Sequence, residues 1–91
     1  MSRTFGDRMG HACGIICTPE IIEYKMDKNV RCIVLGSDGI FEVLPNSILL
    51  QVTTKHLAKR NADAAAEELL EKSVIKWRNK ANYQDDITVV V

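Results

Sequence analysis

The chain lacks three features that would each assign it to a particular class of protein. No apolar run approaches the roughly 20 residues that a membrane-spanning helix needs. Twelve basic and twelve acidic residues cancel, so no field of one sign attracts nucleic acid or an anionic membrane. The N-terminal segment Met1–Asp7 has no apolar core of the signal-peptide kind. We therefore expect a protein of the cytoplasm or nucleus, not secreted, with neither nucleic acid nor a membrane as its partner.

The three cysteines limit the metal and redox chemistry that the chain can carry. Cys13, Cys17 and Cys32 are odd in number, and they sit in or beside apolar, strand-like runs. A structural zinc ion needs four suitably spaced ligands, and the pair Cys13 and Cys17 with a distant His11 is a weak match. We predict three reduced, buried thiols rather than a disulfide or a metal site.

The remaining composition is that of an ordinary globular protein, with 46% hydrophobic and 26% charged residues. A chain of 91 residues is one small domain or a piece of a larger one. Its apolar patterns indicate a mixed fold, α/β of the α+β type, with about four strands and two helices. The strands are expected at residues 15–18, 21–26, 30–37 and 87–91.

The two predicted helices lie between the last two strands. Pro45 suits an early helical position, and Asn46 or Ser47 can cap the helix that follows to Leu57. The second helix is expected from near Asp63 to Trp77, with an apolar face at helical spacing and Glu68–Lys72 as an i,i+4 ion pair. Residues 1–14 and 79–84 are expected to be loops.

Two aspartates carry the clearest chemical signal. Asp38 follows the predicted strand 30–37, and Asp85 immediately precedes the predicted strand 87–91. Two antiparallel helices between these strands return the chain to the sheet, so the second strand runs opposite to the first. The end of one strand then lies beside the start of the other. Both carboxylates would meet at this end of the sheet, which we call the rim. Clustered carboxylate oxygens suit a hard cation such as Mg²⁺ or Mn²⁺.

Ordinary structural roles compete with this interpretation. An Asp before Gly at the end of a strand is as often a turn residue as a metal ligand. Asp86 would point to the opposite face of the strand from Asp85 and is better explained as structural. Arg3 could approach a phosphate, although a solvated or ion-paired arginine is the more common case.

Four segments, in order and at suitable spacing, resemble the C-terminal part of the metal-dependent protein serine/threonine phosphatases of type 2C. The resemblance extends along the whole chain, including residues 64–70 of the second helix. The four segments are Ser2–Asp7, Thr18–Ile21, Ser37–Leu44 and Asp85–Val91.

The resemblance implies a four-layer sandwich, in which helices flank two packed antiparallel sheets. It also implies a hydrolase whose binuclear Mg²⁺ or Mn²⁺ centre activates a water to attack phosphoserine or phosphothreonine. Asp38, in its Asp38-Gly39 motif, and Asp85 match metal ligands of the family. Glu42 stands where the family usually has Asp, at a position linked with an additional metal site, and its longer side chain puts that site in doubt.

Other matched residues are expected to support the site rather than to take part in chemistry. These residues would either contact the metal ligands or hold the surrounding loops, and they are Gly39, Asp86, Asp7 and Arg3. No catalytic residue is identified in this segment, because neither His11 nor His56 matches the family's catalytic acid.

The resemblance covers only the last part of the family's catalytic domain. We therefore expect residues 1–91 to be a single partial domain, without the remaining acidic ligands and the phosphate-binding arginine of the family's N-terminal part. The complete enzyme would act on a phosphoprotein substrate, and this chain alone would be inactive. The alternative is a non-catalytic module that acts through protein–protein contacts or self-association.

Overall fold

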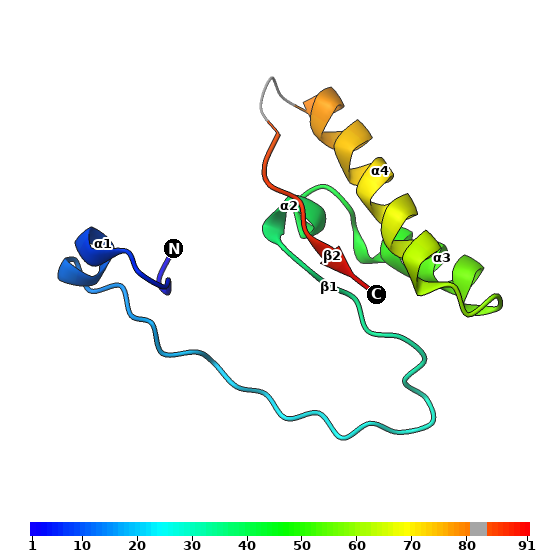
Figure 1. The fold of residues 1–91 in the computed structure, drawn as a ribbon, viewed down its shortest axis with the longest axis horizontal. Coiled ribbons are helices and arrows are strands. Elements are labelled where there is room, and N and C mark those ends of the chain that lie inside the picture. Colours follow the sequence, from blue (N-terminus) through cyan, green and yellow to red (C-terminus); the bar gives the residue numbers. More distant parts are fainter. Residues whose placement is uncertain (81–83) are drawn as a thin grey trace.

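The computed structural model describes residues 1–80 and 84–91, and an extended segment divides it into a small N-terminal part and a helical C-terminal part (Figure 1). Its radius of gyration is 16.1 Å, whereas a compact chain of this length would have about 12 Å. The difference arises from the extended segment, which reaches away from the packed helices. In chain order the elements are α1 (Arg8–Ala12), β1 (Leu35–Gly36), α2 (Asp38–Phe41), α3 (Asn46–Leu57), α4 (Ala62–Lys80) and β2 (Val89–Val90).

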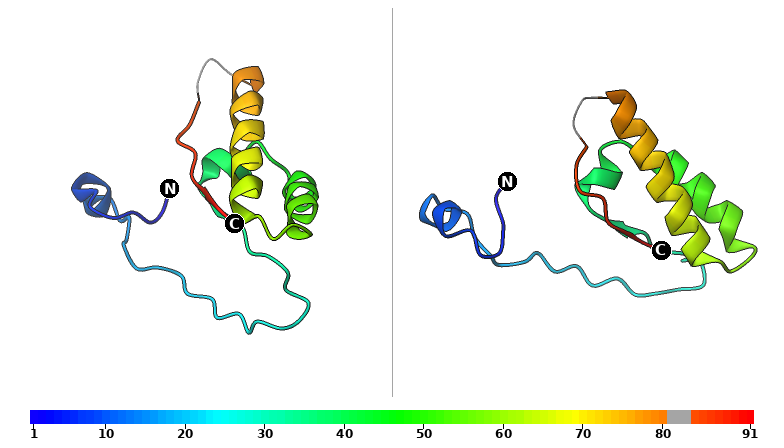
Figure 2. Two further views of the ribbon diagram at one scale, coloured as in Figure 1. Left: turned by 45° about the vertical axis from the view of Figure 1, so that its right-hand side comes forward. Right: turned by 45° about the horizontal axis from the view of Figure 1, so that its top comes forward.

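The core lies where α3, α4, α2 and the strand pair meet, and Figure 2 shows α3 and α4 side by side. The buried residues of α4 recur every four positions, which places them along one helical stripe. They are Ala65, Leu69, Ser73 and Trp77. This stripe packs on Ile40, Leu44 and the buried side of α3, so the two helices fix the position of α2.

The two strands pair antiparallel, with Leu35 opposite Val90 and Gly36 opposite Val89. The antiparallel return that the sequence predicts is therefore confirmed. Exposure alternates strictly from residue 84 to residue 91, and the odd-numbered positions are the half-buried ones. Ile87, Val89 and Val91 pack against the core. Because strand side chains point alternately to two faces, Asp85 lies on the same inner face as these three residues.

The mixed helix-and-strand class is confirmed, but the prediction of about four strands is wrong for the described residues, which form two. Residues 21–26 are extended without being a strand, and Ile21 and Ile22 are 81% and 82% exposed. Ile16 makes only an isolated bridge to Arg3. A strand exists through hydrogen bonds to a neighbour, and the described residues place no strand beside residues 21–26. The four-layer sandwich stays a prediction.

Both predicted helices are present, and α4 runs three residues beyond Trp77 to Lys80. The predicted cap of α3 is wrong, because Pro45 holds the cap position and no side chain caps the helix there. Two short helices, α1 and α2, were not expected. In α1 the Asp7 carboxylate accepts from the Gly10 amide at 2.9 Å, which stabilises a turn inside the predicted loop 1–14.

The prediction of buried thiols is also wrong. Cys13, Cys17 and Cys32 are free and exposed, because the strand-like runs around them are not covered by other elements. No helix of the described residues is long and apolar enough to cross a membrane. Of the predicted loop 79–84, residues 81–83 lie outside the described residues, and residues 79–80 belong to α4.

Candidate metal centre

The strand pairing places Asp38 and Asp85 at the same end of the sheet. Asp38 is the first residue of α2, directly after the β1 end of the ladder, and Asp85 lies on the chain that leads into β2 (Figure 1). Asp38 is exposed and Asp85 is half-buried. The two carboxylates predicted from the sequence therefore lie at one rim of the sheet, which residues 37–39 and 85–88 form.

Ser37 joins the two sides of this rim. Its hydroxyl donates to the Asp86 carbonyl at 3.0 Å and accepts from the Thr88 amide at 3.1 Å. Its own amide donates to the Thr88 carbonyl at 3.0 Å. One residue thus makes three hydrogen bonds to the segment between Asp85 and β2, and it holds the backbone next to Asp38 against the backbone next to Asp85.

Gly39 allows a closer approach than any other residue type would. It is buried, and a Cβ atom built on it would lie 2.4 Å from the Asp86 carbonyl oxygen and 3.1 Å from the carbonyl carbon. Both atoms belong to the backbone, which cannot move aside as a flexible side chain would. The absence of a side chain at position 39 therefore sets how closely the Asp38 turn packs against residue 86.

Local hydrogen bonds orient both carboxylates. Asp38 Oδ1 accepts from the Gly39 amide at 3.1 Å, and Asp85 Oδ1 accepts from the Asp86 amide at 2.9 Å. An ionised carboxylate offers about four acceptor positions, more than a single backbone amide occupies. The ligand atoms that both carboxylates offer to a metal are oxygens, which fit Mg²⁺ or Mn²⁺.

The rim fits a divalent cation only in part. Within residues 1–80 and 84–91, no three His, Cys, Asp or Glu side chains come together in a way that could hold a metal ion. Two carboxylates are fewer ligands than a hard divalent cation takes, since Mg²⁺ needs six oxygen positions around it. The chain therefore offers part of a coordination shell, and other ligands or waters must complete it.

Glu42, the predicted position of an additional metal site, is engaged by a cation of the chain itself. Lys80 Nζ lies 2.7 Å from Glu42 Oε1 and 5.3 Å from the centre of the Trp77 ring. Both side chains of the ion pair are about half exposed, and exposed pairs of this kind contribute at most about 1 kcal/mol. A metal ion at Glu42 would have to displace this ammonium group.

Helix α1 and the residues before it lie apart from the rim, beyond the extended segment (Figure 1). This N-terminal part contains Arg3 and Asp7. Asp7 caps α1, and Arg3 Nη1 pairs with Glu20 Oε2 at 3.1 Å on the surface. The structure thus brings together Asp38, Gly39 and residues 85–86, and it does not bring Asp7 or Arg3 to them.

A separate charge cluster joins α3 to α4. Glu68 Oε2 accepts from Lys55 Nζ at 2.6 Å and from His56 Nε2 at 2.8 Å, and Lys72 Nζ lies 3.5 Å from Oε1. The Glu68–Lys72 pair confirms the sequence prediction. The hydrogen bond from Lys55, followed by that from His56, lowers the pKa of Glu68 from 4.5 to about 2. Its place between the helices indicates a structural role.

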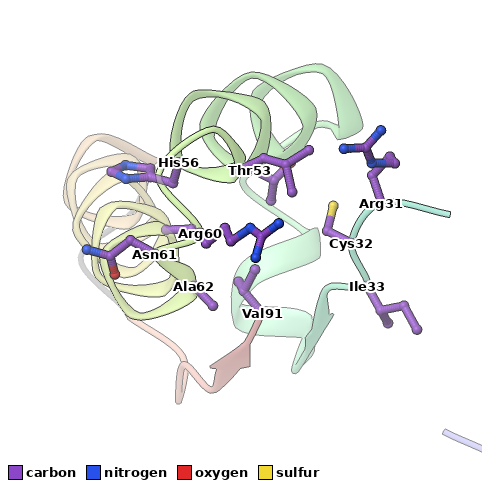
Figure 3. Close-up of a pocket in the computed structure, with 11 residues that line it drawn as sticks. Arg31, Cys32, Ile33, Thr53, His56, Arg60, Asn61, Ala62 and Val91 are labelled. Carbon is purple, nitrogen blue, oxygen red and sulfur yellow. The ribbon is translucent and has the colours of Figure 1, made fainter.

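Figure 3 shows a cavity of about 270 Å³. It lies beside residues 31–33 and Val91, at the opposite end of the strand pair from the aspartates. Its walls come from residues 31–33, from the turn between α3 and α4, and from Val91. Its lining is mainly apolar, with Arg31 and Arg60 among the charged groups. The rim and this cavity are distinct places on the molecule.

The sequence did not single out Ser37 at the rim, nor Ser73 and Trp77, which bond to the rim from α4. Ser37 stood within a recognised motif, and its role depends on contacts 49 and 51 positions away. Ser73 and Trp77 both donate to the Gly39 carbonyl. A serine on an otherwise apolar helical stripe was the signal that could have drawn attention to position 73.

Comparison with known proteins identifies the family of the chain. The family profile described as Protein phosphatase 2C matches residues 1–80. The chain belongs to the protein phosphatase 2C family. It is 35% identical over 92 aligned residues to "Probable protein phosphatase 2C 73" of Oryza sativa subsp. japonica, covering 99% of this chain and 21% of that protein. It is 34% identical over 93 aligned residues to "Probable protein phosphatase 2C 65" of Arabidopsis thaliana, covering 100% of this chain and 24% of that protein.

The chain spans about a fifth to a quarter of the length of these protein phosphatase 2C relatives. No solved structure matches it significantly. The family assignment therefore rests on sequence, and the geometry of the rim comes from this chain alone.

Proposed function

We propose that this chain supplies two aspartate ligands, Asp38 and Asp85, to the divalent-metal centre of a protein serine/threonine phosphatase. The observation that carries the proposal is the antiparallel pairing, reinforced by Ser37, which joins the backbone next to Asp38 to the backbone next to Asp85. Family membership provides the reaction class, hydrolysis of phosphoserine or phosphothreonine in a phosphoprotein. We place this activity in the cytoplasm or nucleus.

In this proposal the residues of the chain orient the metal-binding oxygens and hold the two segments of the rim together. Asp38 and Asp85 present oxygen atoms that their neighbouring amides orient, and Gly39 and Ser37 keep the two segments at a short backbone distance. Two Mg²⁺ or Mn²⁺ ions, when bound, supply the activated water and the charge that neutralises phosphate. With only two ligands at the rim, the chain alone is proposed to be inactive.

The test is thermal unfolding with and without millimolar Mn²⁺. A cation that binds only the folded chain adds about 2.7 kcal/mol at a hundredfold excess over its dissociation constant, which raises the midpoint by on the order of 10 °C in a domain of this size. Asp38→Asn and Asp85→Asn are expected to abolish the shift. Glu71→Gln, which removes an exposed carboxylate from α4, is expected to keep it.

Two results would contradict the proposal. A midpoint of unfolding that Mn²⁺ does not move would refute the metal-binding role. A shift of equal size in the wild type and all three variants would refute it as well. Mn²⁺-dependent hydrolysis of a phosphopeptide by the 91-residue chain, lost in Asp38→Asn, would support Asp38 as a metal ligand. It would refute the proposal that the chain alone is inactive.

A second candidate function, self-association, is favoured by the extended segment. Ile21, Ile22 and Tyr24 are 81%, 82% and 71% exposed. They form an apolar group on a stretch of backbone that pairs with no strand of the part of the chain that the structure describes. Glu23 within it complements the basic Arg31 and Arg60 beside the cavity of a second copy. Sedimentation at several concentrations should show a dimer that Ile22→Lys weakens, and a monomer at every concentration would exclude it.

A further inference from the structure

One carbonyl oxygen of the rim receives two hydrogen bonds from α4. Ser73 Oγ and Trp77 Nε1 each donate to the Gly39 carbonyl at 2.8 Å, from 34 and 38 positions further along the chain. The two donors are four residues apart, so they lie one above the other on the same face of the helix. A helix remote in sequence thus contacts the residue that follows Asp38.

These donors are inside the core. Ser73 is 0% exposed and Trp77 is 4% exposed. Burying a hydroxyl is unfavourable unless it is hydrogen-bonded, and an alanine would fill a helix stripe of this kind without that cost. A carbonyl oxygen has two lone pairs, and here each is matched by a donor. The arrangement fixes the position of this carbonyl rather than merely filling space.

Gly39 is consequently held from two sides. Its oxygen is bound by α4, and its Cα is pressed so closely against the Asp86 carbonyl that a Cβ would come within 2.4 Å. Asp38 is the adjacent residue, and its carboxylate accepts from the Gly39 amide. The position of Gly39 therefore determines where the Asp38 carboxylate lies relative to residues 85 and 86.

We propose that Ser73 and Trp77 are positioning residues for the metal ligand Asp38. They act through the Gly39 carbonyl, so that α4 sets the separation of the two sides of the rim. Lys80 adds an outer connection from α4 to α2, since it lies over the Trp77 ring and pairs with Glu42. The inference rests on the proposed function, because it gives a role to these residues only if Asp38 binds the cation.

The variants remove one donor at a time and leave most of the packing in place. Trp77→Phe keeps an aromatic ring without the indole N–H, and Ser73→Ala removes the hydroxyl. Thr53→Val is the matched control, because Thr53 is a buried hydroxyl whose bonds stay within α3, at 2.8 Å to the Leu49 carbonyl and 3.2 Å to the Leu50 carbonyl among the described residues. All measurements are made well below the melting temperature of each variant.

The first readout is the dissociation constant for Mn²⁺, from electron paramagnetic resonance titration of the whole chain. Removal of a group that orients a metal ligand weakens binding on the order of tenfold, so we expect that loss in Trp77→Phe and in Ser73→Ala and none in Thr53→Val. Unchanged Mn²⁺ affinity in the double variant Ser73→Ala, Trp77→Phe would overturn the inference. An equal loss in Thr53→Val would do the same, because it would show a general effect of destabilisation.

The second readout needs no metal. Amide hydrogen exchange at Ile40, Phe41 and Glu42, whose N–H groups bond to Ser37 and Asp38 carbonyls, should accelerate in both variants and stay unchanged in Thr53→Val. If the wild type binds no Mn²⁺, the proposed function fails, and exchange alone decides whether α4 holds this turn. Acceleration at residues 40–42 no greater than in the control would overturn that claim as well.

Discussion

Replacing Gly39 by alanine separates two effects of opposite sign. Gly39 lies inside the short helix α2, where alanine is normally preferred to glycine by about 0.5–1 kcal/mol. In this position, however, the new Cβ would lie 2.4 Å from the Asp86 carbonyl oxygen. Forcing a methyl group into a close-packed site costs about 1–3 kcal/mol. The obstacle here is backbone on the far side of the rim, so we take the upper part of that range.

The expected net effect of Gly39→Ala is a loss of about 2 kcal/mol of unfolding free energy. In a domain of this size such a loss lowers the midpoint of thermal unfolding by roughly 8–16 °C. Circular dichroism at 222 nm follows the transition, because the signal comes mainly from α3 and α4. Mn²⁺ stabilisation should fall as well, since residue 86 must move away from Asp38.

Gly36→Ala is the matched control in the neighbouring strand. Its Cβ would lie 3.1 Å from the Thr88 carbonyl oxygen, a contact that a shift of a few tenths of an ångström relieves. We expect a smaller loss there than at Gly39. A Gly39→Ala protein that melts at or above the wild-type temperature would refute the argument, because helix preference would then outweigh the close approach.

Two further predictions concern the packing of α3 and α4. Glu68→Gln should reduce the loss of stability in acid. The pKa of Glu68 in the folded chain, about 2, lies below the ordinary 4.5. The stabilisation by Glu68 is therefore present above pH 4.5 and disappears as the pH falls from 4.5 towards 2. Melts from pH 7 to pH 3 check this, and parallel pH profiles of the two proteins would contradict it. Leu69→Ala, at a position with 0% exposure, should cost about 2–5 kcal/mol in urea unfolding. Leu70→Ala, at 41% exposure, should cost much less, and similar losses at both positions would contradict the assigned helical face.

The sequence predicted the features that depend on local pattern. The stripe through Leu69 and Trp77 has helical spacing, and the apolar run after Asp85 returns antiparallel to β1 because two helices intervene. The positions of Asp38 and Asp85 at one rim follow from that topology. Ordinary turn chemistry at Asp38 could be weighed against metal binding, but periodicity could not decide between them.

Features that depend on distant partners could not be predicted. Residues 21–26 have a strand-like composition, yet a strand needs a neighbour, and local pattern does not reveal whether one is present. Burial of the cysteines, which lie in or beside the similar runs 15–18 and 30–37, was predicted on the same basis and is wrong for the same reason. The bonds from Ser73 and Trp77 to Gly39 join residues 34 and 38 positions apart, and no spacing rule relates them.

The long separation of Ser37 and Asp86 has a consequence for the order of folding. These residues are 49 positions apart, and closing a loop of n residues costs about (3/2)RT ln n before any contact compensates. The α3–α4 hairpin closes over a much shorter stretch, so we expect it to form in the transition state while the rim is still open. A cation that binds the completed rim would then slow unfolding and leave the folding rate almost unchanged. Metal bound by Asp38 and Asp85 would prolong the lifetime of the native chain without making it fold faster.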